Sequence, residues 1–177
     1  MMKRINVVKR RTLYRGRIIR LDLETLEVRG RRIVRETIHH PGAVVIVPVL
    51  PGRRLVFVRQ YRRSVQRFLL ELPAGTLERG ERRDACARRE LIEETGWRAG
   101  RLRRIGQFFA APGVISEQLT VFVATDLRLE TACPEPDESV TPVILSVSQA
   151  LAKIRSGAIC DAKSIIGVLF AERAKLV

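Results

Sequence analysis

The sequence has no apolar run long enough to cross a lipid bilayer. Its first residues, 1–11, are basic and lack the apolar stretch that a signal peptide needs. These two absences argue against a membrane protein, and a cytoplasmic location is the default expectation.

Cysteine is scarce. The three cysteines, Cys86, Cys133 and Cys160, match no zinc-binding spacing, and an odd number does not suit a disulfide framework. We therefore expect reduced thiols that contribute mainly to packing.

Acidic residues and lysine are few beside arginine. The chain has 33 basic and 19 acidic residues, a formal net charge of +14, and only five lysines. Such a charge invites a nucleic-acid-binding interpretation. The basic residues, however, are spread from Lys3 to Lys175 and form no cluster with interleaved aromatics. The charge therefore favours an anionic substrate, and a nucleic-acid partner is not expected.

Apolar residues are plentiful enough for a buried core. The 177 residues, of which 46% are hydrophobic, fit one globular domain. The β-branched run 43–50 predicts a central strand, and a turn at 51–54 predicts a hairpin with a strand over 55–61. Strands are also expected within 12–38 and at 68–72, 105–109, 119–124 and 140–145, and helices at 82–95, 148–156 and 162–175. This order predicts an α/β fold with a mixed sheet flanked by helices.

The helix predicted at 82–95 carries three glutamates on one face. Glu90, Glu93 and Glu94 are spaced i, i+3 and i+4, and Gly96 stands at the expected C-cap. Like charges on one face repel each other, and a cation among them would turn that cost into binding energy. Oxygen ligands suit Mg²⁺ or Mn²⁺, and Mg²⁺ commonly shares its coordination shell with substrate phosphates. The alternative to a metal site is an acidic helix face exposed to solvent. On the evidence of these three residues alone, this alternative would be preferred.

Two neighbours extend the pattern. Glu81 precedes Glu90 by nine residues, which on one continuous helix would turn it to the opposite face, so it joins the cluster only from the preceding loop. Arg89 precedes Glu93 by four residues and is expected to orient it through an ion pair. We predict supporting roles for Glu81 and Arg89.

The whole segment resembles the signature of the Nudix hydrolases. In that signature a glycine is followed after five residues by glutamate, and after seven more by Arg-Glu-apolar-x-Glu-Glu-x-Gly-apolar. The matching positions are Gly75, Glu81, Arg89, Glu90, Leu91, Glu93, Glu94, Gly96 and Trp97. Trp97 stands where the family usually has an aliphatic residue, which affects packing and not chemistry.

The resemblance extends beyond this box to the ADP-ribose pyrophosphatase branch. It rests on residues 38–48, 59–62, 71–75, 112–117 and 161–167. The branch implies an α/β/α sandwich around a mixed sheet, preceded by N-terminal antiparallel strands. It also implies a homodimer in which these strands complete the partner's substrate site. Residues 1–40 would form the dimerisation region and residues 41–177 the Nudix domain, in one structural unit.

The resemblance implies roles for individual residues. Glu90 and Glu94 would be the principal metal ligands, Glu93 a further ligand or a support for the attacking water, and the Ala74 carbonyl another metal contact. Substrate contacts would come from Arg35, Arg62 and Glu117. The branch also places a catalytic glutamate on a late loop, where Glu138 is the first choice and Glu135 the alternative.

The implied activity is Mg²⁺-dependent hydrolysis of a nucleoside diphosphate sugar, with ADP-ribose giving AMP and ribose 5-phosphate. GDP-mannose, NADH, a dinucleoside polyphosphate or capped RNA would suit the same chemistry. A different class is a non-catalytic nucleotide-sensing or nucleic-acid-binding module on this fold. Such modules typically lose glutamates of the box, and this chain keeps all of them.

Overall fold

The computed structural model describes residues 5–130 and 140–177. By its internal contacts the chain divides into two compact units. The first comprises the chain up to Gly42 together with Phe109–Gln118, and the second comprises Ala43–Phe108 and Leu119–Val177. No helix among the described residues is long and apolar enough to span a membrane.

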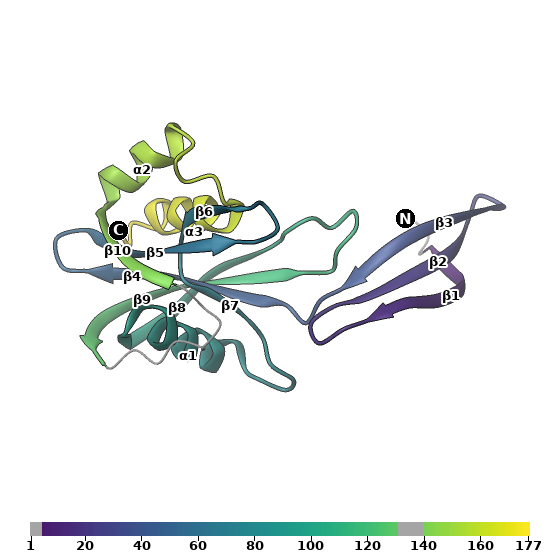
Figure 1. Ribbon diagram of the computed structural model, residues 1–177, viewed down its shortest axis with the longest axis horizontal. Coiled ribbons are helices and arrows are strands. Elements are labelled where there is room, and N and C mark those ends of the chain that lie inside the picture. Colours follow the sequence, from purple (N-terminus) through teal and green to yellow (C-terminus); the bar gives the residue numbers. More distant parts are fainter. Residues whose placement is uncertain (1–4, 131–139) are drawn as a thin grey trace. The chain divides into compact units, whose positions relative to one another are not determined.

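The first unit is built on an antiparallel sheet of three strands, β1 (Asn6–Arg15), β2 (Arg20–Val28) and β3 (Arg31–His39), in the order β1-β2-β3 (Figure 1). The turn between β2 and β3 consists of Arg29 and Gly30, whose φ angles are 51° and 73°. Positive φ at both central residues is the hairpin turn whose twist matches its strands. The predicted turn near Gly30 is therefore present, and the strands begin earlier than the predicted 12–38.

The second unit contains a seven-stranded mixed sheet. Its main path runs β10-β5-β4-β9-β8, with β6 paired to β5 and β7 paired to β4. The strands are β4 (Ala43–Leu50), β5 (Arg54–Arg62), β6 (Arg67–Glu71), β7 (Ala74–Thr76), β8 (Trp97–Phe109), β9 (Gln118–Leu129) and β10 (Val140–Ser146). β4 and β9 pair in parallel, whereas β4 with β5 and β5 with β10 pair antiparallel, which makes the sheet mixed.

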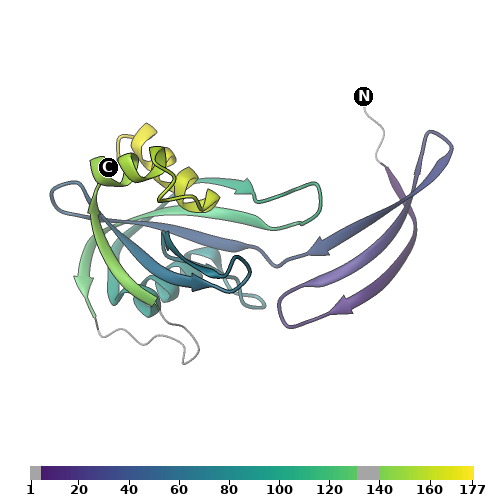
Figure 2. The ribbon, with the colours of Figure 1, turned by 45° about the horizontal axis from the view of Figure 1, so that its top comes forward.

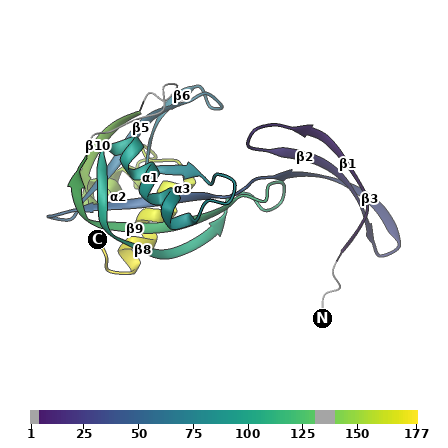
Figure 3. The same ribbon diagram turned by 90° about the horizontal axis from the view of Figure 1, so that it is seen from below.

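Helices cover both faces of this sheet. The helices α2 (Val147–Arg155) and α3 (Ala162–Arg173) lie on one face of the sheet (Figure 2). Helix α1 (Arg83–Thr95) lies on the opposite face, and Figure 3 shows this face from below. The arrangement confirms the predicted α/β/α sandwich.

β4 supplies both halves of the core. Val44 and Ile46 pack in the cluster on the α1 side, and Val45 and Val47 pack in the cluster that includes residues of α2 and α3. All four are 0% exposed. Because successive side chains point to opposite faces, a strand covered on both sides must be apolar throughout. This explains the uninterrupted β-branched run.

Three strands differ clearly from the sequence prediction, and one of them is β9, which continues to Leu129 where the prediction ended at 124. β7 was not predicted, because three residues including Gly75 carry no periodic pattern. β8 begins at Trp97 and not at 105. It lies at the edge of the sheet order, and within 97–104 only Ala99 is buried, so the apolar alternation of a covered strand is missing there.

Candidate active site

The acidic helix α1 begins and ends as its sequence requires. Arg82 is its N-cap in extended conformation, and Gly96 is the C-cap in the left-handed region with φ 70°. The Gly96 amide donates to the Ile92 carbonyl at 2.8 Å. Cys86 and Leu91 are buried against the sheet. The C-cap predicted at Gly96 is confirmed.

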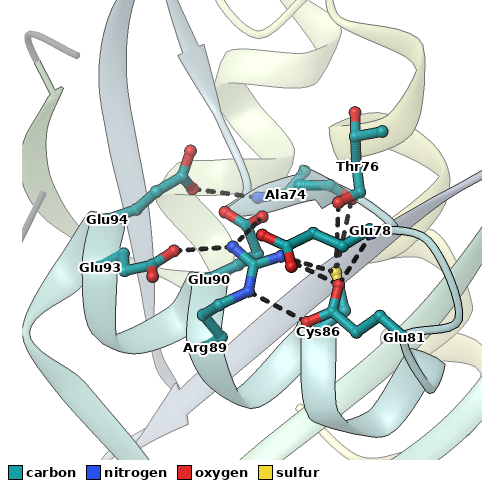
Figure 4. Close-up of polar contacts among 10 residues, drawn as sticks. Ala74, Thr76, Glu78, Glu81, Cys86, Arg89, Glu90, Glu93 and Glu94 are labelled. Carbon is teal, nitrogen blue, oxygen red and sulfur yellow. Dashed lines mark hydrogen bonds and ion pairs between the residues drawn. The ribbon is translucent and has the colours of Figure 1, made fainter. Parts of the chain in front are cut away.

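Arg89 is the centre of the acidic cluster (Figure 4). Its Nη1 donates to Glu90 Oε1 at 2.8 Å and to Glu93 Oε2 at 2.9 Å. Its Nε and Nη2 donate to the two oxygens of Glu81 at 3.0 and 3.1 Å. The hydrogen bonds to Glu81 are the largest of the influences that raise the pKa of Arg89. One guanidinium thus holds three carboxylates together.

Glu81 lies in the loop before α1 and reaches the cluster from there. Gly80, with φ 80°, precedes it, and the Glu81 amide donates to the Glu78 carbonyl at 3.1 Å. The hydrogen bond from Arg89 lowers the pKa of the Glu81 carboxyl, which therefore stays charged. Glu81 and Arg89 form a support under the glutamates of the helix.

Strand β7 lies directly against the glutamates. The Ala74 amide donates to Glu94 Oε2 at 3.0 Å, and Glu94 is 4% exposed. A Cβ on Gly75 would lie 1.8 Å from the Glu90 carboxyl carbon, so only glycine leaves room for this carboxylate. The site therefore gathers carboxylate oxygens beside the backbone of a strand, and this all-oxygen donor set suits a hard divalent cation.

Arg62 lies at the end of β5 beside this cluster. Its Nε and Nη2 donate to the Glu71 carboxylate at 2.9 and 2.6 Å. The hydrogen bonds to Glu71 are the largest influence raising the pKa of Arg62, and the charge of Glu94 contributes as well. A guanidinium close to the acidic helix is thus fixed by a buried carboxylate.

Other predicted residues lie elsewhere. Arg35 is exposed on β3 in the first unit, where its Nη1 donates to the Val34 carbonyl at 3.1 Å. Glu117, also in the first unit, has Oε1 3.8 Å from His40 Nδ1. Glu135 and Glu138 lie outside the described residues.

The first unit contains an acidic cluster that the sequence did not reveal. Among the described residues, Asp22, Glu24 and His39 form the one group of three whose potential ligand atoms all lie within 4.8 Å of one another. Arg10 binds Glu24 at 2.7 Å, and Arg20 binds Asp22 at 3.1 Å. Because arginines already neutralise both acids, we interpret the group as buried polar contacts that stabilise the sheet and not as a metal site.

This cluster escaped the sequence analysis for a simple reason. Asp22 and Glu24 alternate with leucines on β2, and alternating acidic residues normally indicate a solvated face. Here they are 0% and 9% exposed. Only the register with β1, which pairs Arg10 with Glu24 and Thr12 with Asp22, reveals the partners.

Comparisons with known proteins agree with the fold and the acidic helix, which together define a Nudix hydrolase. A family model described as NUDIX domain matches residues 39–164, and the chain belongs to this family.

Relatives and a solved structure support this assignment. The chain is 33% identical to ADP-ribose pyrophosphatase of Bacillus subtilis (strain 168), over 92% of this chain and 90% of that protein. It is 32% identical, with the same coverage, to methanol dehydrogenase activator of Bacillus methanolicus. The crystal structure of an ADP compounds hydrolase superposes with a TM-score of 0.87 over 98% of this chain and 95% of that one, at 23% identity, a likeness of fold.

Proposed function

We propose that this chain hydrolyses the diphosphate bond of ADP-ribose to AMP and ribose 5-phosphate, with Mg²⁺ as the working metal and Mn²⁺ as a possible substitute. The observation that carries the proposal is the convergence of Glu90, Glu93 and Glu94 beside β7, where the guanidinium of Arg89 spans Glu90 and Glu93. The Bacillus subtilis relative, named ADP-ribose pyrophosphatase, supports the choice of substrate.

The residues present fit a divalent cation. Glu90 and Glu94 would be its principal ligands, with Glu93 and the Ala74 carbonyl as further contacts, and Gly75 keeps the space that Glu90 needs. A bound cation would offset the negative charge of the diphosphate, orient it and lower the pKa of a water.

The protein's own side chains would do the remaining work. Arg89 holds Glu81, Glu90 and Glu93 in fixed positions. Arg62 would bind a phosphate oxygen through its guanidinium. Glu138 is the proposed general base that accepts a proton as water attacks phosphorus, with Glu135 and Glu93 as alternatives.

The first unit is proposed to complete the substrate site in a homodimer. Its strands expose apolar side chains that a second copy would cover, including Val7 at 44%, Leu13 at 46%, Tyr14 at 56% and Val34 at 57%. Arg35 and Glu117 would then contact the substrate, and residues 1–40 would serve dimerisation. A nucleotide-sugar substrate also suits the cytoplasmic location that we propose.

A substrate panel tests the proposal. The purified chain is assayed on ADP-ribose, GDP-mannose, NADH and a dinucleoside polyphosphate, each with Mg²⁺, with Mn²⁺ and with excess chelator. The expected result is the highest kcat/KM on ADP-ribose and no turnover with chelator. A preference for GDP-mannose would replace the substrate and keep the chemistry. Salt-dependent binding of nucleic acid without metal-dependent turnover would favour the non-catalytic module.

A further inference from the structure

The start of α3 contacts a segment of chain about ninety residues earlier. Asp161 is the N-cap of α3 and accepts from the Ser164 amide at 3.1 Å and from the Ser164 hydroxyl at 2.6 Å. The Ser164 hydroxyl oxygen in turn accepts from the Leu72 amide at 2.7 Å. Residues 161–167, which resemble a branch motif but carry no role in the proposed chemistry, are thus attached to the strand segment before Ala74.

Lys163 reaches the carboxylate that holds Arg62. Its Nζ donates to Glu71 Oε2 and, at 2.9 Å, to Asp161 Oδ2. Glu71 is 1% exposed and accepts from both Arg62 and Lys163. Burial alone would raise the pKa of Glu71, but hydrogen bonds from Arg62 and the charge of Lys163 hold it below its usual value. Glu71 is therefore a buried anion shared by two cations.

The same contacts continue toward the acidic helix. A Cβ on Gly167 would lie 2.6 Å from Leu72 Cδ1, so this glycine lets α3 pack closely on Leu72. The Pro73 carbonyl accepts from the Ile46 amide at 2.9 Å, and the Ala74 amide donates to Glu94. An unbroken set of contacts thus runs from α3 to the carboxylates of α1.

Arg62 keeps one nitrogen for another acceptor. Glu71 uses its Nε and Nη2, and Nη1 forms no hydrogen bond within the residues that the structure describes. The Arg62 side chain is 36% exposed. A guanidinium fixed on one side and open on the other is suited to bind a phosphate oxygen.

We propose that Lys163 is a positioning residue for Arg62 and acts through Glu71. This inference rests on the proposed function, because it assigns Arg62 to the substrate diphosphate. Lys163 supplies part of the counter-charge that Glu71 requires, so Glu71 offsets less of the positive charge of Arg62, and more of that charge acts on the substrate. Without Lys163, Arg62 becomes the only cation bound to a buried anion, and its guanidinium is drawn toward Glu71. The cap of α3 does not depend on this role, because Asp161 and Ser164 form it.

The test compares Lys163→Met with Lys163→Arg, and uses Lys175→Met as a control for loss of a lysine, since Lys175 is exposed. With ADP-ribose and Mg²⁺, Lys163→Met is expected to raise KM about tenfold, the scale of one charge-assisted contact, and to change kcat by less than about threefold. Lys163→Arg restores KM to within about threefold, because it can still bind Glu71. Unchanged KM, a loss confined to kcat, or no rescue by arginine would overturn the inference.

A binding measurement separates this inference from the proposed reaction. Calorimetric titration of inorganic pyrophosphate in the presence of Mg²⁺ requires no turnover. About tenfold weaker binding by Lys163→Met than by the unchanged chain or Lys175→Met supports the positioning role, even if the substrate panel were to reject ADP-ribose. Equal affinity of the three proteins, or no pyrophosphate binding by the unchanged chain, contradicts it.

Discussion

Each of the two units contains an acidic cluster bridged by arginine, and the two clusters differ in charge balance. In the first unit, Asp22 and Glu24 are matched by Arg10 and Arg20. In the second, Arg89 bridges Glu81, Glu90 and Glu93, and Glu94 lies beside them and accepts from the Ala74 amide. Among the interactions of residues 5–130 and 140–177, the first set pairs two acids with two arginines, whereas the second gathers four carboxylates around one arginine.

The difference indicates how to recognise a cation site. Among the described residues, the one group of three potential ligand atoms that all lie within 4.8 Å of one another is Asp22, Glu24 and His39 of the first unit. Proximity alone would therefore select the balanced cluster. A surplus of carboxylates on a rigid helix is the better criterion, because only an unbalanced cluster gains when a cation arrives.

The largest expected effect concerns the proposed general base of the late loop. Carboxylates held by arginine or engaged with metal are poor proton acceptors, so the general base is predicted to be Glu138. Glu138→Gln should lower kcat by about 10²–10⁴-fold with little change in substrate binding. The matched variant Glu135→Gln should be mild. Steady-state kinetics of the variants tests this prediction. If Glu135→Gln or Glu93→Gln loses most of its kcat while Glu138→Gln stays active, the general base is that other glutamate.

Removing one charge from the unbalanced cluster should nearly stop the reaction. Glu94→Gln keeps the size of the side chain but weakens the cation site, and kcat should fall by roughly two orders of magnitude or more. Glu172→Gln on α3, an exposed position, serves as the control. Near-normal turnover of Glu94→Gln would refute the metal site.

Metal should stabilise the protein through one cluster only. At a Mg²⁺ concentration about a hundredfold above its Kd, the Tm should rise by roughly 5–10 °C, because the ion binds only the folded state. Glu90→Gln should remove most of this rise, and Glu24→Gln should leave it intact. Thermal unfolding with and without Mg²⁺ gives the answer. A rise lost in Glu24→Gln and kept in Glu90→Gln would move the metal to the first unit.

The balanced cluster should matter for stability. Glu24→Gln leaves the half-exposed Arg10 facing a neutral side chain at the buried position 24, which should lower the free energy of unfolding by about 1 kcal/mol. Glu27→Gln, exposed on the same strand, should have little effect. Denaturant titrations of both variants test this. If the two variants have the same free energy of unfolding, the ion pair between Arg10 and Glu24 does not contribute to stability.

The smallest expected effect is a pH dependence in acid. Burial would raise the pKa of Asp22, but the Thr12 hydroxyl and the charges of Arg20 and His39 hold it below its ordinary value. The stabilisation from Asp22 is therefore complete above that ordinary value and is lost as pH falls through the lower folded-state pKa. Unfolding free energies measured across acidic pH should fall less steeply for Asp22→Asn than for the unchanged chain. Identical slopes would contradict the shift.

Much of the fold is predictable from local sequence. The run of β4, the turn at Gly30 and the C-cap at Gly96 each depend on neighbouring residues, so periodicity and glycine positions reveal them. The strand β7 could not be predicted because it is only three residues long. The start of β8 could not be predicted because it has few buried residues.

The site was predictable from the sequence for the glutamates of α1 and for Glu81, which joins them from the preceding loop as expected. The spacing of Glu90, Glu93 and Glu94 defines a shared face without any tertiary information. The partnership of Glu71 with Lys163 was not predictable, because the two residues are 92 positions apart and neither stands in a periodic pattern. Long-range charge pairs of this kind become visible only when the strands and α3 are packed.

The arginine-rich strand β8 has a consequence for how copies of this protein behave in a crowded solution. An open sheet edge offers unpaired backbone groups that another chain can extend into an aggregate. Arg98, Arg101, Arg103 and Arg104 line this strand and are exposed. When two such edges approach, their charges repel each other before the backbones can pair. Arg98 and Arg101 pair with Glu130 and Asp126, so we expect Arg103 and Arg104 above all to limit such aggregation, independently of catalysis.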